Sequence, residues 1–198
     1  FCPHMQQPSV KYFWWPRFEI IAAWMTEEEA RRRQDGLIEI YAEINGSVDL
    51  AGPFGSVRVT ARADRVERCA DQSLRIIDYK TGVVPSAKMV ENGARSQLLV
   101  EALIASEGGF DQVPAGAVSQ IEYWQISGGR AQPGTIKPMH TNGFDSAKMR
   151  DSLERLVTAY DDMSTCYLSE PVPSLVPPFR PYKHLARCRE WQIEADDD

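Results

Sequence analysis

Apolar and polar residues alternate through the middle of the chain and predict a series of β-strands. Residues 38–50 carry an apolar side chain at nearly every second position, which is the period of a strand with one buried face. The Asn-Gly pair at 45–46 indicates either two paired strands or one strand with a turn. Two further runs, 57–67 and 74–80, are joined by the polar turn 70–73, so we expect an antiparallel hairpin.

Helical spacing of apolar residues marks three other segments: 17–33, 94–107 and 146–167. The charged end of the first helix, residues 27–33, is interpreted as solvent-exposed surface. Residues 1–16 are rich in proline and aromatic side chains and are expected to form an irregular lead-in. Residues 83–91 are expected to be a loop, and 118–126 another strand.

The order of these elements predicts an α+β fold. A helix, antiparallel strands, a helix, a strand and a helix follow one another, and a mixed, largely antiparallel central sheet flanked by helices on both faces would bury their apolar sides. We expect a lead-in and N-terminal helix at 1–36, a core at 37–168, and a Pro-rich, basic tail packed on the core at 169–198.

Composition places the chain among ordinary globular proteins. Apolar residues make up 43% of its 198 residues, and the formal charge is −6, which argues against a general nucleic-acid coating protein but leaves room for a local basic groove. The four cysteines are scattered, which suits a reducing, cytoplasmic location. No apolar window is long enough to span a membrane. Because the chain begins with Phe1, we expect it to be part of a longer protein.

The predicted hairpin brings two acidic residues face to face. If its turn is centred on Asp71, then Asp64 lies opposite Asp78. Like charges directly across a sheet are destabilising, and a divalent metal between them is the simplest source of neutralising charge. Lys80 lies two residues beyond Asp78 and therefore on the same face. Two carboxylates and a lysine on one face are typical of a site that cleaves phosphodiesters.

The chemistry of such a site accounts for each residue. Mg²⁺ prefers oxygen ligands, which Asp64, Asp78 and the backbone carbonyl of Tyr79 can provide, and it activates water for attack on phosphorus. Lys80 would orient that water or neutralise developing charge. The alternative is an ordinary surface hairpin in which Asp78 and Lys80 form a weak ion pair. The apolar run before Asp78 and the matching register favour the metal site.

Three segments resemble the RecB-type branch of the PD-(D/E)XK nuclease superfamily: 63–67 (Ala-Asp-Arg-Val-Glu), 77–82 (Ile-Asp-Tyr-Lys-Thr-Gly) and 97–99 (Gln-Leu-Leu). The resemblance implies a restriction-endonuclease-like core and DNA cleavage with Mg²⁺, for which Mn²⁺ can substitute. It implies that Asp64 and Asp78 are metal ligands, that Lys80 is the catalytic lysine, and that Gln97 supports the site from the next helix. Residues 37–168 would then be the nuclease core.

The tail adds a second resemblance. Residues 181–191 are similar to the end of the nuclease-bearing B subunit of AddAB, a bacterial helicase–nuclease that processes double-strand breaks. This implies an exonuclease in repair and recombination, with DNA and a helicase–nuclease subunit as partners. Many relatives bind an iron–sulfur cluster here through several cysteines; this segment contains only Cys188, so no cluster is predicted. We expect Tyr182, Leu185 and Trp191 to pack the tail instead.

The chain departs from the family pattern at two points. Relatives usually carry a tyrosine four residues after Gln97, where this chain has Glu101. They also carry a helix with a metal-binding histidine upstream, for which His4 in the lead-in is no convincing equivalent. That helix is expected to precede Phe1 or to be lacking, and the isolated fragment would then be weakly active or inactive.

Two rival functions remain open from the sequence. The first is a catalytically weak or inactive DNA-binding or scaffold module of the same complex, which the intact acids and lysine speak against. The second is a stand-alone RecB-like exonuclease associated with CRISPR adaptation, a group that usually has the cysteine cluster absent from this sequence. Arg62 and Arg65 are candidate phosphate contacts, with solvated or ion-paired side chains as an equal alternative.

Overall fold

A five-stranded sheet with the order β1-β2-β3-β4-β5 forms the centre of the molecule. The computed structural model describes residues 7–139, 144–168, 172, 181 and 183–186. The strands are β1 (Leu37–Gly52), β2 (Gly55–Cys69), β3 (Leu74–Lys80), β4 (Val118–Ile126) and β5 (Gly134–Met139). β3 and β4 are parallel, while the other neighbours are antiparallel. The predicted α+β class with a mixed, largely antiparallel sheet is confirmed.

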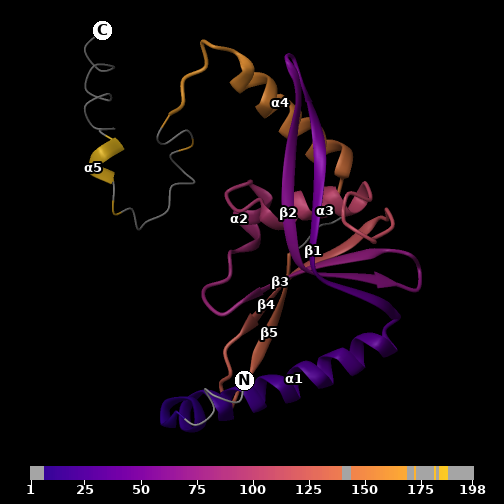
Figure 1. Cartoon of the computed structure of the whole chain (residues 1–198), viewed down its shortest axis with the longest axis vertical. Coiled ribbons are helices and arrows are strands. Elements are labelled where there is room, and N and C mark those ends of the chain that lie inside the picture. Colours follow the sequence, from indigo (N-terminus) through magenta and orange to yellow (C-terminus); the bar gives the residue numbers. More distant parts are fainter. Residues whose placement is uncertain (1–6, 140–143, 169–171, 173–180, 182, 187–198) are drawn as a thin grey trace.

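Helices lie on both faces of this sheet. They are η2 (Val10–Trp14, a π-helix), α1 (Trp15–Gln34), α2 (Ala87–Glu91), α3 (Gln97–Ser106), α4 (Ser146–Asp161) and α5 (Lys183–Ala186). Figure 1 shows α4 running beside the long β1–β2 hairpin, whereas α1 crosses the other end of the molecule beside β4 and β5. Trp24 of α1 meets Trp124 of β4 edge-on, with their ring centroids 5.6 Å apart. No helix within the described ranges is long and apolar enough to cross a membrane.

The β2–β3 hairpin has the predicted register. Arg65 pairs with Ile77, and Val66 pairs with Ile76. The next step of this register brings Asp64 and Asp78 together at the open end of the pairing. β3 has the predicted limits, and the turn lies at residues 70–73 as expected. The local sequence was therefore sufficient to align these two strands.

β1 runs without interruption through the Asn-Gly pair, so the prediction of a turn there is wrong. The backbone of Gly46 instead forms an isolated bridge with Phe110, which follows α3. The adjacent Ser47 N–H donates to the carbonyl of Gly109 at 3.0 Å. A Cβ atom on Gly46 would lie only 2.3 Å from the Phe110 ring. The glycine provides space for this contact rather than a turn.

Replacing Gly46 with alanine is expected to destabilise the protein by about 1–3 kcal/mol, because Phe110 must move to accept the methyl group. Urea unfolding followed by circular dichroism would measure the change. Gly82→Ala is the matched control, since a Cβ there meets nothing within 4 Å. Equal unfolding free energies for the two variants would contradict this explanation.

Several element limits differ from the predictions. The described part of the expected lead-in is helical, because η2 continues directly into α1. α2 lies within the expected loop at 83–91, and α4 ends at Asp161 rather than at 167. β5 was missed because Pro138 interrupts its pattern; a proline is tolerated here because β5 is an edge strand.

The apolar core lies between the sheet and α3. The α3 residues Leu98, Ala102, Leu103, Ile104 and Ala105 are all fully buried. From α4, Met149, Leu153 and Val157 pack against this core. Leu156 of the same helix is exposed. In the tail, Leu185 is also exposed, so its predicted packing role is wrong; Tyr182 and Trp191 lie outside the described residues.

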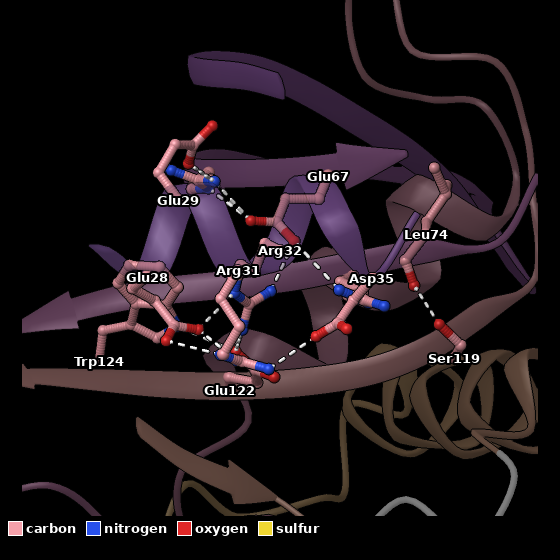
Figure 2. A network of polar contacts seen from close by, with 12 residues as sticks. Glu28, Glu29, Arg31, Arg32, Asp35, Glu67, Leu74, Ser119, Glu122 and Trp124 are labelled. Atoms are coloured by element: carbon pink, nitrogen blue, oxygen red, sulfur yellow. Dashed lines mark hydrogen bonds and ion pairs between the residues drawn. The ribbon is translucent and has the colours of Figure 1, made fainter. Parts of the chain in front are cut away.

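One residue in the charged end of α1 is buried, contrary to the expectation of solvent-exposed surface for the whole segment, whereas Arg31 and Arg33 are exposed as expected. Arg32 is only 2% exposed and donates to Glu67 at 2.6 Å and also to Glu122 (Figure 2). Its guanidinium lies 4.8 Å from the centroid of the Trp124 ring. Glu67 also accepts from Arg65 at 2.8 Å. These five residues, here called the rear ion network, hold α1 against β2 and β4.

Candidate active site

Asp64 and Asp78 come together where β2 and β3 separate. Asp78 is 1% exposed, and Asp64 is half-buried. One carboxylate oxygen of Asp64 accepts a hydrogen bond from the backbone N–H of Tyr79 at 2.9 Å. Burial raises the pKa of Asp78 and the nearby charge of Asp64 adds to this, while hydrogen bonds to Lys80 and Gln97 oppose it without cancelling it. The pair is held in place at an electrostatic cost that a cation would relieve.

Lys80 projects to the same side of β3 as Asp78. Its Nζ donates to Asp78 Oδ1 at 2.8 Å and lies 2.8 Å from Oδ2, which accepts no well-directed hydrogen bond. Tyr79 lies on the other face, where its ring meets Trp124 edge-on at 5.7 Å between centroids. The alternation of side chains along β3 thus separates a polar site from the rear packing, as the sequence predicted.

Gln97 reaches the same carboxylate from the start of α3. Its Nε2 donates to Asp78 Oδ1 at 2.8 Å and to Glu101 Oε1 at 3.1 Å. Glu101, one helical turn later, is 1% exposed. The sequence interpretation assigned Glu101 no role, although its spacing of four residues from Gln97 places both side chains on one helix face.

Glu101 is an unusual buried acid. Its Oε2 has no hydrogen-bond partner in the described part of the chain. Burial raises the pKa of Glu101 to about 7, and the charges of Asp78 and Asp64 add to this, against the opposing effects of Gln97 and Lys80. Burial likewise raises the pKa of the neighbouring Tyr123 to about 12, and the charges of Asp78 and Glu101 contribute. The interacting acids therefore extend from Asp64 on β2 through Asp78 on β3 to Glu101 on α3.

A cavity of about 400 Å³ opens beside these groups. It is lined by Lys80, Val83, Pro85, Ala94, Arg95, Ser96, Gln97 and Tyr123. Lys80 and Arg95 give its wall positive charge, and an anionic phosphodiester entering here would meet Lys80 next to Asp78. The sequence interpretation did not single out Arg95, which carries no motif and faces the cavity only because of how α3 packs.

The side chains at this site could provide some, but not all, of the ligands of a divalent cation. Asp64 and Asp78 offer carboxylate oxygens, and the buried Oδ2 of Asp78 has no hydrogen bond within the described residues. Such oxygens are the ligands that Mg²⁺ prefers. Over the same residues, no three His, Cys, Asp or Glu side chains are grouped closely enough to form a metal site by themselves. Two carboxylates together with the Tyr79 carbonyl and waters are the donor set that fits.

The two candidate phosphate-binding arginines occupy different environments. Arg65 is 7% exposed and pairs with Glu29 at 2.7 Å and with Glu67 at 2.6 Å on the rear face. Its predicted contact with nucleic acid is therefore corrected to a structural role. Arg62 has an exposed side chain that pairs with Glu43 at 3.1 Å, and its contact with DNA stays a prediction.

Comparison with known proteins identifies the class. The family model of the PD-(D/E)XK nuclease superfamily matches residues 6–188. The chain belongs to this superfamily, whose members are nucleases that generally use divalent metal ions such as Mg²⁺. The sheet described above agrees with the restriction-endonuclease-like core expected of such a protein.

Among curated proteins, the similar ones are uncharacterized. A Rickettsia typhi protein is 37% identical over 95 residues, covering 48% of this chain and 11% of that protein. A Rickettsia conorii protein is 36% identical over 78 residues, covering 39% and 9%. The match thus spans about a tenth of the length of these relatives. A solved structure described as "Crystal structure of SSO0001" has 13% identity and a TM-score of 0.40, covering 70% of this chain and 62% of that one.

The shifted pKa of Glu101 predicts a pH-dependent difference in stability. An unfolded carboxyl ionises near 4.5, whereas the folded one keeps its proton to about 7. Over this window the folded state binds more protons, so the unfolding free energy falls as pH rises. Relative to Glu101→Gln, the parent without divalent cations should lose about 2–3 kcal/mol between pH 5 and pH 8.

Urea titrations of parent and variant at the two pH values would measure this difference. Asp78, Asp64, Lys80 and Tyr123 also face Glu101 but are common to both proteins. Glu91→Gln, which changes an exposed acid, is the control and should follow the parent. A parent–variant difference that does not change with pH would contradict the shifted pKa.

Proposed function

We propose that the chain is the Mg²⁺-dependent DNA nuclease domain of a bacterial helicase–nuclease, an exonuclease acting in cytoplasmic repair and recombination of double-strand breaks. The supporting observation is the convergence on buried Asp78 of Lys80 from β3 and Gln97 from α3, each 2.8 Å from the same carboxylate oxygen. If Asp78 and Lys80 formed only a structural ion pair, the second donor Gln97, the adjacent Asp64 and the open cavity would have no explanation.

The roles of the residues follow from their positions. Asp64 and Asp78, with the Tyr79 carbonyl, would hold Mg²⁺, which when bound supplies Lewis-acid stabilisation and a water of lowered pKa. The backbone N–H of Tyr79 occupies one oxygen of Asp64 and so keeps that carboxylate turned toward β3. Lys80 borders the cavity, where its ammonium can neutralise charge on the scissile phosphate. Gln97 restrains the carboxylate of Asp78.

The assignment to a helicase–nuclease is supported by the resemblance of residues 181–191 to the end of the AddAB B subunit. The greater length of the Rickettsia relatives is compatible with additional domains. The alternative, a catalytically weak DNA-binding module of the same complex, is disfavoured because Asp64, Asp78 and Lys80 are all present, with Lys80 donating to Asp78 and the Tyr79 N–H to Asp64.

Cleavage of end-labelled linear DNA and of closed circular DNA would test the proposal. With Mg²⁺ or Mn²⁺ the chain, or a version extended upstream of Phe1 if the fragment alone is weakly active, should degrade linear DNA from its ends and leave closed circles intact, and EDTA should stop the reaction. Equal cutting of circles would contradict an exonuclease. If calorimetry shows that Mn²⁺ binds but neither DNA is cleaved, the inactive-module alternative is supported instead.

A further inference from the structure

Glu101 has no assigned role, yet the structure gives it a defined polar contact. Its side chain is 1% exposed, and no cationic side chain in the described residues pairs with it. Its one hydrogen bond in that part of the chain comes from Gln97, at 3.1 Å. A buried carboxylate without a counter-charge is destabilising, so its presence calls for a reason other than stability.

The contact with Glu101 determines how the Gln97 amide is turned. The same Nε2 atom faces Asp78 Oδ1 at 2.8 Å and Glu101 Oε1 at 3.1 Å. An amide nitrogen has two hydrogens, and both are used by these carboxylates. If the amide were reversed, its carbonyl oxygen would face Asp78 Oδ1, which already accepts from Lys80, so the repulsion does not depend on whether Glu101 carries a proton. Glu101 and Asp78 therefore force that carbonyl oxygen to point away from both acids.

We propose that Glu101 is a positioning residue that fixes the Gln97 amide so that its carbonyl oxygen is presented to the cavity as a hydrogen-bond acceptor. Gln97 lines this cavity together with Lys80. A donor bound there beside Asp78, such as the attacking water, would be oriented by the Gln97 oxygen on one side and by the acid on the other. The inference rests on the proposed function, and it concerns the residue at which this chain departs from the pattern of its relatives.

Two variants of nearly equal volume separate positioning from packing. Glu101→Gln retains an oxygen that can accept from Gln97, whereas Glu101→Leu removes it. We expect Glu101→Leu to lower kcat about 10- to 100-fold with little change in KM, since the lost orientation affects the reacting groups rather than binding. Glu101→Gln should restore most of kcat. Equal kcat values for the two variants would overturn the proposal.

A double-mutant cycle tests whether the effect passes through Gln97. Once Gln97→Ala has removed the amide, adding Glu101→Leu should reduce kcat little further. Fully additive losses would mean that Glu101 acts independently of Gln97, and the proposal would be wrong. Urea unfolding of each variant identifies any loss that is due to instability.

A measurement without catalysis keeps the inference separable from the proposed function. In ¹⁵N-labelled protein, hydrogen exchange of the Gln97 side-chain amide should be slow in the parent and in Glu101→Gln, and fast in Glu101→Leu. Slow exchange in a protein that cleaves no DNA would reject the nuclease proposal while retaining the positioning contact. Rapid exchange in the parent would overturn the positioning proposal whatever the activity.

Discussion

Replacing Asp78 with asparagine is expected to lower metal-dependent DNA cleavage about 10³-fold or more. Asp78 is the centre of the site, because Lys80 and Gln97 both donate to its Oδ1 and its Oδ2 is buried without a hydrogen bond in the described region. An amide offers one neutral oxygen where the proposed cation needs a charged ligand, so metal affinity and transition-state stabilisation fall together. Cleavage rates on linear DNA and Mn²⁺ binding by calorimetry would measure the two effects.

A lysine variant distinguishes metal binding from charge stabilisation. Lys80→Met should reduce cleavage about 10²- to 10³-fold while Mn²⁺ binding persists, because Lys80 contributes no ligand. Asp151→Asn and Lys88→Met change exposed residues outside the site and should leave both measurements unchanged. Parental activity in Asp78→Asn or Lys80→Met would reject the site assignment.

Replacing Arg32 with methionine is expected to reduce the unfolding free energy by about 3–5 kcal/mol. Arg32 is the cation between Glu67 and Glu122, and these acids are only 0% and 2% exposed. Methionine fills similar space but leaves two buried carboxylates short of positive charge, which is strongly destabilising. Urea unfolding at neutral pH, monitored by tryptophan fluorescence because Trp124 lies within the rear ion network, would measure the loss.

The neighbouring arginine is the matched control for this experiment. Arg31 pairs with Glu28 and Asp35, but its side chain is 56% exposed, so Arg31→Met should change stability by less than about 1 kcal/mol. Combining Arg32→Met with Glu67→Gln and Glu122→Gln should recover much of the loss, because the uncompensated charges are then gone. A triple variant as unstable as Arg32→Met would show that packing, not charge, is responsible.

The two experiments address opposite faces of the same strands. On β2, Asp64 belongs to the candidate site while the adjacent Arg65 belongs to the rear ion network. On β3, Asp78 belongs to the candidate site while the adjacent Tyr79 packs against Trp124 of the network. Arg65 also lies within 3.5 Å of the Tyr79 hydroxyl. The rear ion network therefore stabilises the two strand segments that carry the proposed catalytic acids, and α1 contributes to that stabilisation.

The sequence by itself determined the arrangement of the candidate site residues to the extent that this arrangement depends on local periodicity. Asp64 lies near Asp78 because the turn sets the register between two strands that are adjacent in sequence. Lys80 lies on the same side as Asp78 because side chains alternate along a strand with a period of two residues. The strong apolar pattern likewise identified the helix that begins near Gln97. These features require no knowledge of how distant segments meet.

Only the tertiary structure decided which charges are buried and why certain residues are present. Arg32 resembles its exposed neighbours in sequence, and it becomes a core residue because α1 docks where Glu67 and Glu122 converge from separate strands. Gly46 follows Asn45 in a pair typical of a turn, but the fold places Phe110, which follows α3, against it. The role proposed for Glu101 depends on Gln97, which donates to both Glu101 and Asp78. Each of these outcomes depends on contacts between residues far apart in the chain, which local propensity and periodicity do not encode.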